Sequence, residues 1–258
     1  MRFSVIIPTW NEGPQIAPAL RRLREISDQA HMEIILVDGG STDNTVAAAR
    51  DWADQVRVLD KPNRGAQLHA GAALATGDLF FFLHADVLPP SNWQERLEKT
   101  WLGLQERRLA ATVFTVDYGR DWSFRLVAAG QNLRARWFGL ASGDQGFCVS
   151  ADVYAKSGGF PEIPLMEDVE FCRRLSKIGD LVVLPDLIRP SARRLKRSGA
   201  LGNSLFNHWL VLRYMLGADP AALWERYYKE EIREPPPSVP PSDPERHPFA
   251  YLRKKKRR

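Results

Sequence analysis

The sequence has little cysteine, no long apolar run and almost no net charge outside its last six residues. Two cysteines, Cys148 and Cys172, in 258 residues are too few for a disulfide framework, and they lack the CxxC spacing of a zinc site. The longest apolar stretches fall short of the ~18 residues that a membrane span needs. The apolar run at the N-terminus breaks at Pro8 and does not predict a signal peptide. A cytoplasmic location is the default expectation.

The positive charge is concentrated at the C-terminus. The chain has 36 Lys and Arg against 31 Asp and Glu, a net charge of +5 and a pI of about 9.3. The last six residues, 253–258, are all basic, so the rest of the chain is nearly neutral. They follow a proline-rich stretch that cannot build a packed element. We therefore expect a folded body over residues 1–233 and a disordered tail over 234–258. We expect no nucleic-acid partner, and a tail that can hold the protein at the inner face of the cell membrane.

Short apolar runs alternate with helical patterns through the first half. This alternation predicts an α/β fold with a doubly wound, mostly parallel sheet, flanked by helices and followed by C-terminal helices. The expected strands of this half are 3–7, 33–37, 56–59 and 79–83, and the expected helices are 14–27, 45–52 and 66–75. For the second half we expect strands at 110–116, 146–149 and 181–184, and helices at 122–137, 166–178, 201–216 and 220–231.

Polar residues follow each of the first four expected strands. Ligands of such sheets bind beyond the carboxyl ends of the strands, so these positions form the candidate site. The second set starts at Asp38 and continues with Gly39-Gly40, a turn that either binds a nucleoside or simply connects a strand to a helix. Arg64 precedes a helix, where an anion can bind. The four sets are 8–12, 38–43, 60–65 and 84–86.

Two further groups carry carboxylates. His84 and Asp86 end a fully apolar strand and could share a divalent cation with a diphosphate, or Asp86 could simply be a helix cap. Glu167 and Asp168 begin an expected helix, where they either cap it or supply a general base.

The order of these motifs resembles the family-2 glycosyltransferases with a GT-A fold. The match extends from about residue 3 to residue 180, through Pro8-Thr9-Trp10-Asn11-Glu12, Val37 to Asp43, Arg64-Gly65, His84-Ala85-Asp86 and Glu167-Asp168. The sequence is most similar to a small single-domain bacterial branch associated with arsenosugar biosynthesis and carotenoid (diaponeurosporenoate) glycosylation. The resemblance implies a nucleotide-sugar-binding half over about 1–115 and an acceptor half over 116–233.

The resemblance also implies residue roles. Asp168 would be the catalytic base of an inverting transfer, supported by Glu167, and Asp144 and Gln145 would contact the acceptor. Asp86, joined by His84, would bind the metal. The donor, with a UDP-sugar favoured, would be held by Pro8, Thr9, Asn11, Glu12, Asp38, Gly39, Arg64, Gly65, His84, Ala85 and Asp86. Arg193 and Arg194 belong to a basic cluster that either closes over the diphosphate of the donor or is a solvated helix end or loop.

His84 stands where the family usually has the first aspartate of an Asp-x-Asp motif. An imidazole favours Mn²⁺ over Mg²⁺ at this position, so the resemblance implies a divalent metal, Mn²⁺ first. The expected acceptor is a hydroxyl or carboxylate of a small molecule or a lipid. The apolar helix 201–216 could lie on a bilayer, pack in the core or form a dimer face. The oligomeric state stays open.

Two other classes compete with this interpretation. A nucleotidyltransferase shares the nucleotide-binding layout, but it usually has a glycine-rich loop with a lysine after its first strand. Residues 8–13 have one glycine and no basic residue. A non-enzymatic module that binds a membrane or nucleic acid would depend on the basic tail.

Overall fold

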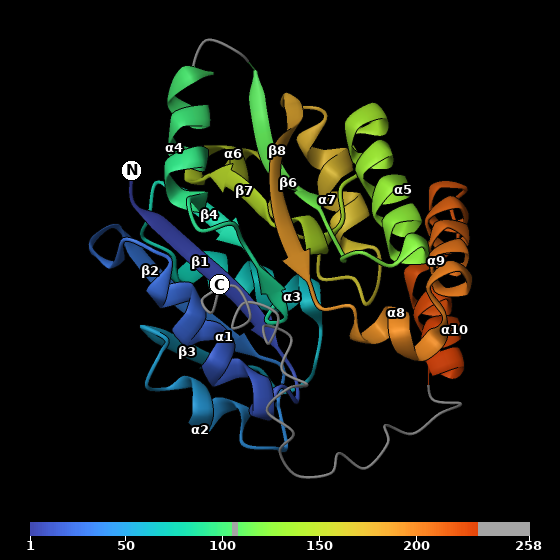
Figure 1. The fold of residues 1–258 in the computed structure, drawn as a ribbon, viewed down its shortest axis with the longest axis horizontal. Helices are drawn as coiled ribbons and strands as arrows, with labels where there is room; N and C mark the ends of the chain where they lie inside the picture. The colour runs from blue at the N-terminus through green and yellow to red at the C-terminus, as the bar shows by residue number, and fades with distance from the viewer. Residues whose placement is uncertain (105–107, 232–258) are drawn as a thin grey trace.

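The computed structural model describes residues 1–104 and 108–231 and has a mixed eight-stranded sheet at its centre (Figure 1). The strand order is β3-β2-β1-β4-β7-β6-β8-β5. The strands are β1 (Phe3–Thr9), β2 (Met32–Asp38), β3 (Gln55–Val58), β4 (Leu79–Phe82), β5 (Val87–Leu88), β6 (Leu109–Val116), β7 (Phe147–Ser150) and β8 (Asp180–Pro190). The predicted α/β fold is confirmed, and the expected tail lies outside the described residues.

The first half of the chain builds the parallel part of the sheet. Strand β1 pairs in parallel with β2 on one side and with β4 on the other, and β2 pairs with β3. The connections are α1 (Gly13–Glu25), α2 (Thr45–Ala49) and α3 (Arg64–Leu74). All four strands end at the same edge, so the polar residues that follow them are brought together.

The second half is less parallel than expected. Strand β7 is antiparallel to both β4 and β6, and the short β5 is antiparallel to β8. Strand β8 extends well past the expected 181–184, because the register shifts between Phe114 and Thr115 of β6. Leu184 pairs with Phe114 and Leu187 with Thr115, so Pro185 falls in the bulge and needs no ladder hydrogen bond.

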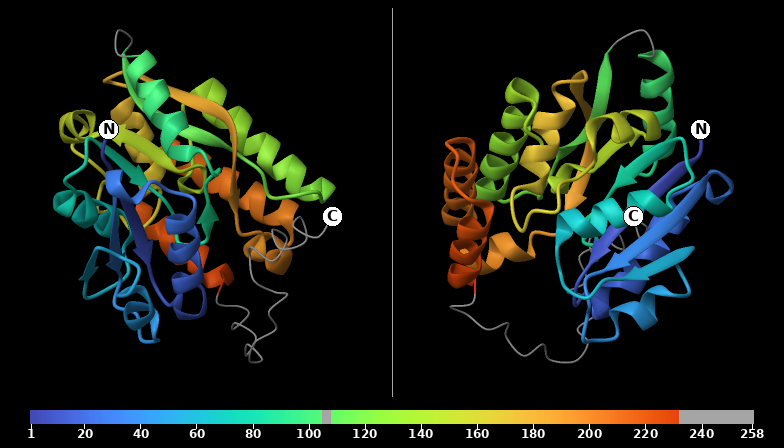
Figure 2. Two further views of the ribbon diagram at one scale, coloured as in Figure 1. Left: turned by 60° about the vertical axis from the view of Figure 1, so that its left-hand side comes forward. Right: turned by 180° about the vertical axis from the view of Figure 1, so that it is seen from behind.

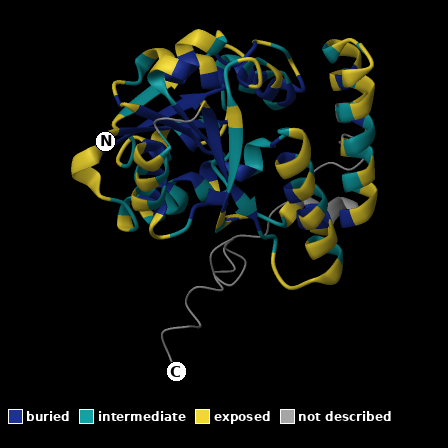
Figure 3. Cartoon of the chain, turned by 90° about the horizontal axis from the view of Figure 1, so that it is seen from above, coloured by how far each residue is buried: buried dark blue, intermediate teal, exposed yellow. Residues whose placement is uncertain are grey.

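Helices cover both faces of the sheet, and the buried positions gather in the strands between them (Figure 3). One core cluster includes residues of α1, α2 and α4 (Trp93–Gly103), with the indole of Trp93 fully buried. The other includes residues of α3, α6 (Ala151–Ser157) and α7 (Glu167–Leu175). The helices α4 and α6 and the strand β5 were not among the expected elements.

The remaining helices lie beside this body. They are α5 (Trp122–Phe138), the short α8 (Arg193–Ser198), α9 (Ala200–Met215) and α10 (Pro220–Glu231). Views from the front and from behind place α9 and α10 at the edge of the molecule (Figures 1 and 2). Leu210 of α9 and Leu223 of α10 pack on Met166 and Val169, at the start of α7. The outer helices therefore support the segment that carries Glu167 and Asp168.

Candidate functional site

The loops after β1 and β2 are tied to each other. Asp38 is fully buried, and its carboxylate accepts hydrogen bonds from Thr9 Oγ1 at 3.1 Å, from Ser41 N at 2.7 Å and from Ser41 Oγ at 2.5 Å. Ser41 Oγ in turn accepts a hydrogen bond from the backbone N–H of Asn11 at 2.8 Å. Asp38 thus organises the turn in this conformation, and the base contact predicted for it stays a prediction.

Asn11 has a strained backbone. Within the described residues it is one of two non-glycine residues with a positive φ, at 53°, and Met166 is the other, at 69°. Asn11 is held there because its Oδ1 accepts a hydrogen bond from Thr42 N at 3.0 Å. Such conformations cost about 1–3 kcal/mol and cluster at functional sites. The two strained residues belong to the loop after β1 and to the start of α7, which are both parts of the predicted site.

Gln67 joins the carboxyl ends of β1 and β2, although no role was predicted for it. Its buried Nε2 donates to Thr9 O at 2.8 Å and to Val37 O at 2.9 Å. Gly39 lies against the same amide, because a Cβ there would be 3.2 Å from Gln67 Nε2 and 2.8 Å from Pro62 Cα. Gln67 lies one helical turn after Arg64 on the side of α3 that faces the sheet, and this position is the signal that could have identified it.

Arg64 and Glu167 form an ion pair between residues that are 103 positions apart. The Glu167 side chain is 3% exposed and that of Arg64 is 37% exposed. Gly65 allows the approach, since a Cβ there would lie 2.0 Å from Pro161 O. The structure therefore joins two motifs that the sequence offered separately, and Glu167 positions Arg64 at the start of α3.

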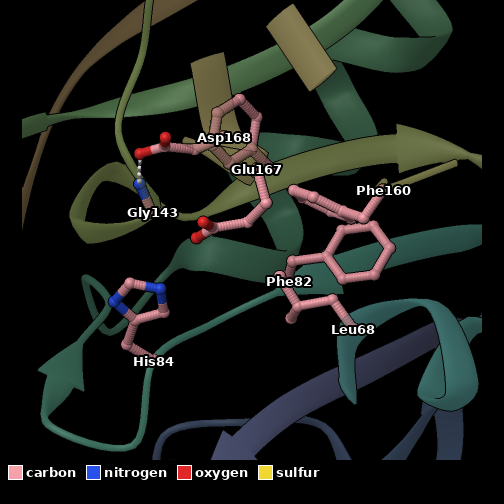
Figure 4. A pocket seen from close by; sticks show the side chains of 8 residues that line it. Leu68, Phe82, His84, Gly143, Phe160, Glu167 and Asp168 are labelled. Atoms are coloured by element: carbon pink, nitrogen blue, oxygen red, sulfur yellow. Dashed lines mark hydrogen bonds between the residues drawn. The ribbon is translucent and has the colours of Figure 1, made fainter. Parts of the chain in front are cut away.

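Asp168 lies at a small pocket that is also lined by His84, Gly143, Glu167 and Phe82 (Figure 4). Its Oδ2 accepts a 3.4 Å hydrogen bond from Gly143 N. Burial raises the pKa of Asp168 above its usual value and the Glu167 carboxylate reinforces the shift, whereas nearby arginines oppose it. A carboxylate with a raised pKa at a pocket has the character of a general base.

His84 faces the same pocket and not a cluster of metal ligands. Its Nδ1 lies 3.3 Å from Asp144 Oδ1, and Tyr118 donates its hydroxyl to Asp144 Oδ2 at 2.6 Å. Burial raises the pKa of Tyr118, and the Asp144 carboxylate raises it further. Tyr118 was not predicted, although it follows the end of β6 as the other site residues follow their strands. Gln145, which was predicted with Asp144 to contact the acceptor, is fully buried in the turn η2 (Gly143–Gln145). Its Nε2 donates a hydrogen bond to Phe114 O at 3.2 Å.

Asp86 lies beside Arg193, the first residue of α8. The backbone N–H of Ser191 donates to Asp86 O at 2.9 Å. Arg193 Nη2 lies 3.5 Å from Glu12 Oε2 and 3.9 Å from Asp86 Oδ2. Arg193 thus joins the loop after β1 to the loop after β4, and its predicted contact with the donor stays a prediction. The side chain of Arg194 lies outside the described part of the chain.

The described residues supply few metal ligands. Nowhere in 1–104 or 108–231 do three or more His, Cys, Asp or Glu side chains gather in a group that could hold a metal ion. Asp86 and Glu12 remain as carboxylates on either side of Arg193. This set fits a cation that takes one or two ligands from the protein and the others from a diphosphate and water, as Mg²⁺ does at nucleotide sites.

Comparison with known proteins places these observations in a family. The model of glycosyl transferase family 2 matches residues 4–139. The chain is 28% identical over 242 residues to the glycosyltransferase AglE of Haloferax volcanii, covering 86% of this chain and 79% of AglE. It is 33% identical over 134 residues to the undecaprenyl-phosphate 4-deoxy-4-formamido-L-arabinose transferase of Pseudomonas fluorescens, but this match covers 48% of the chain and only 39% of that relative.

Solved structures share the fold. The mannosyltransferase PcManGT from Pyrobaculum calidifontis, in complex with GDP-Man and Mn²⁺, matches with a TM-score of 0.63 and 20% identity over 99% of this chain and 68% of that one. The glucosyl-3-phosphoglycerate synthase of Mycobacterium tuberculosis, in complex with Mn²⁺, UDP and glucosyl-3-phosphoglycerate, has a TM-score of 0.55 and 21% identity over 83% of this chain and 79% of that one. At this identity the similarity establishes the fold.

Proposed function

The chain belongs to glycosyl transferase family 2, and from this premise we propose that it transfers a sugar from a nucleotide-sugar donor to a hydroxyl or carboxylate with inversion at the anomeric carbon. The observation that carries the proposal is the position of Asp168. It is a half-buried carboxylate with a raised pKa at a pocket whose other wall includes His84, two residues before Asp86. A single base suits direct displacement, in which the acceptor loses its proton as it attacks the anomeric carbon.

The donor would bind at the carboxyl ends of β1, β2 and β4. Thr9, Asn11 and Asp38 brace one wall there, and Arg193 bridges to Asp86 on the other. We propose a UDP-sugar as the donor to test first and GDP-mannose as the second. UDP and GDP-mannose are held by two structures of the same fold. The leaving diphosphate needs positive charge, and Arg193 is the proposed side chain to supply it.

Asp86 is the proposed metal ligand. When bound there, Mn²⁺ or Mg²⁺ would neutralise the negative charge that develops on the leaving diphosphate. His84 remains a predicted second ligand, but its contact with Asp144 favours a role on the acceptor side of the pocket. Asp144, held by Tyr118, is then the proposed acceptor contact.

The acceptor is proposed to be a small molecule or a lipid. Support for the lipid comes from the similarity to the undecaprenyl-phosphate transferase, although that match covers about half of this chain. The pocket beside Asp168 is small and has an apolar wall that includes Phe82, Phe147 and Phe160. It suits the part of an acceptor that presents the attacking oxygen, while the rest of the acceptor lies outside.

The test is a panel of nucleotide sugars measured by thermal shift, with and without Mn²⁺, followed by transfer assays with the donor that shifts the Tm. We expect one donor to raise the Tm in a Mn²⁺-dependent manner, and Asp86→Ala to remove the Mn²⁺ dependence. Asp168→Asn should bind the donor normally and lower the transfer rate by about 10²–10⁴-fold. Normal transfer by Asp168→Asn would refute the base assignment, and the absence of a shift with any donor would refute the transferase proposal.

A further inference from the structure

Helix α5 presents an apolar stripe to solvent. Its large exposed side chains are spaced four, seven and four residues apart, which places them on one face of the helix. Trp137 is 72% exposed and Leu126 is 56% exposed. The whole stripe consists of Trp122, Leu126, Leu133, Trp137 and, at the helix end, Phe138. Side chains of this size that share one exposed face indicate a surface made for a partner.

Helix α9 presents a second stripe beside the first. Leu205 is 73% exposed, and the other exposed apolar residues on or at the end of this helix are Leu201, Leu212, Met215 and Leu216. The two helices pack against each other, with Gly130 of α5 facing the His208 ring of α9. Figures 1 and 2 show them next to each other at one side of the molecule. We call the two stripes together the α5–α9 face.

The charge of this face identifies its partner. Neither α5 nor α9 contains an Asp or Glu, whereas together they carry four arginines, of which Arg125, Arg136 and Arg213 are exposed. Tryptophan and arginine around an apolar stripe are typical of surfaces that enter the headgroup region of a bilayer, where anionic lipids attract the positive charge. A second copy of the chain would instead bring arginines against arginines across a two-fold axis.

The face is connected to the catalytic segment. On its buried side α9 packs Leu210 against Met166 and Val169, and Tyr214 donates a hydrogen bond to Glu170 of α7 at 3.0 Å. Within the described residues no helix is long and apolar enough to cross a bilayer, so the contact would be peripheral. We propose that the α5–α9 face docks on an anionic lipid bilayer and holds the pocket close to its surface. The benefit to catalysis, access to a lipid-borne acceptor, rests on the proposed function, but the docking itself does not.

The experiment is flotation of the full-length protein with vesicles of phosphatidylcholine, with or without phosphatidylglycerol. We expect binding to the anionic vesicles and a loss of about tenfold or more in the Leu126→Ser/Leu205→Ser variant, because two exposed leucines would no longer enter the lipid. Arg125→Glu should weaken binding to anionic vesicles by at least about fivefold. Leu102→Ser on α4, with a 52% exposed leucine away from the face, is the matched control and should bind like the wild type.

All variants keep residues 253–258, so attraction by the basic tail is the same in each. Wild-type binding by both face variants would overturn the proposal and assign docking to the tail or another surface. Failure of the wild type to bind, or a dimer that the face variants convert to a monomer in light scattering, would overturn it as well. Flotation involves no sugar transfer, so none of these outcomes bears on the transferase proposal.

Discussion

Replacing Gly143 by alanine should disturb the pocket through a single steric contact. A Cβ at this position would lie 2.3 Å from both Cε1 and Nε2 of His84, whereas an ordinary contact is at least 3.4 Å. The His84 ring must therefore retreat by at least about 1 Å. Gly143 has no positive φ, so the added methyl group brings no backbone strain of its own.

The ring can move only at a cost. His84 is held by Asp144 at 3.3 Å and its side chain is 18% exposed, so a retreat breaks this contact. We expect Gly143→Ala to lower the free energy of unfolding by about 1–3 kcal/mol, which lowers the Tm by about 2–4 °C per kcal/mol. The transfer rate should fall further, by about 10²-fold, because groups around the acceptor would be misplaced by about 1 Å.

Chemical denaturation and a transfer assay measure the two effects. Gly103→Ala is the matched control, because a Cβ there would have nothing within 4 Å. The decisive comparison repeats Gly143→Ala in a His84→Ala background, where the ring that causes the clash is absent. The stability cost should then largely disappear, with a coupling energy of about 0.5–3 kcal/mol. An unchanged cost in that background would refute the steric reasoning, whatever the activity does.

Four further predictions concern the ionisable groups and the helix α3. Asp168→Asn should raise the Tm at neutral pH. The pKa of Asp168 in the folded state is raised above 3.8, so the ionised carboxylate destabilises the wild type as the pH rises through that pKa, and this penalty vanishes below pH 3.8. A series of Tm measurements against pH checks this. For the same reason the rate of transfer should increase with pH along a limb whose midpoint lies above 3.8. Glu167→Gln should lower the free energy of unfolding, measured in urea, by about 2–3 kcal/mol. This is less than the loss expected on breaking a fully buried ion pair, because Arg64 is 37% exposed. Gly65→Ala should lower the free energy of unfolding by about 3 kcal/mol, because a Cβ there would meet the carbonyl of Pro161, which is backbone and cannot rotate away. Wild-type stability of Glu167→Gln or Gly65→Ala would contradict the contact that the variant tests.

The first half of the fold was predictable because each strand is a buried apolar run followed by polar turn residues. Strands β1, β2 and β4 lie within two residues of their expected bounds. The second half was harder to predict for identifiable reasons. In the sequence Pro185 indicates the end of a strand, but the bulge in β8 accommodates it. Strand β5 has two residues, too few for any periodic pattern, and it exists only because β8 reaches it.

The candidate site was predictable as a set of loops but not as a set of contacts. The rule that ligands bind after parallel strands selected Thr9, Asp38 and Asp86 correctly as neighbours of one edge. It could not reveal that Asp38 uses its carboxylate on Thr9 and Ser41, because that depends on the turn conformation. Gln67 was also missed, because its signal in the sequence is only its place one helical turn after Arg64 on the side of α3 that faces the sheet.

The ion pair of Arg64 and Glu167 links the start of α3 to the start of α7. Arg64 begins α3, which follows β3 in the parallel half of the sheet, and Glu167 begins α7, whose next residue is the proposed base. Any movement of Arg64 toward a diphosphate would break the pair and leave Glu167 buried without its partner, beside Asp168. That would raise the pKa of Asp168 further, because the Arg64 charge lowers it in the present arrangement. Donor binding and the readiness of the proposed base to accept a proton would therefore be coupled through this pair, and Glu167→Gln should reduce that coupling even where it leaves donor affinity intact.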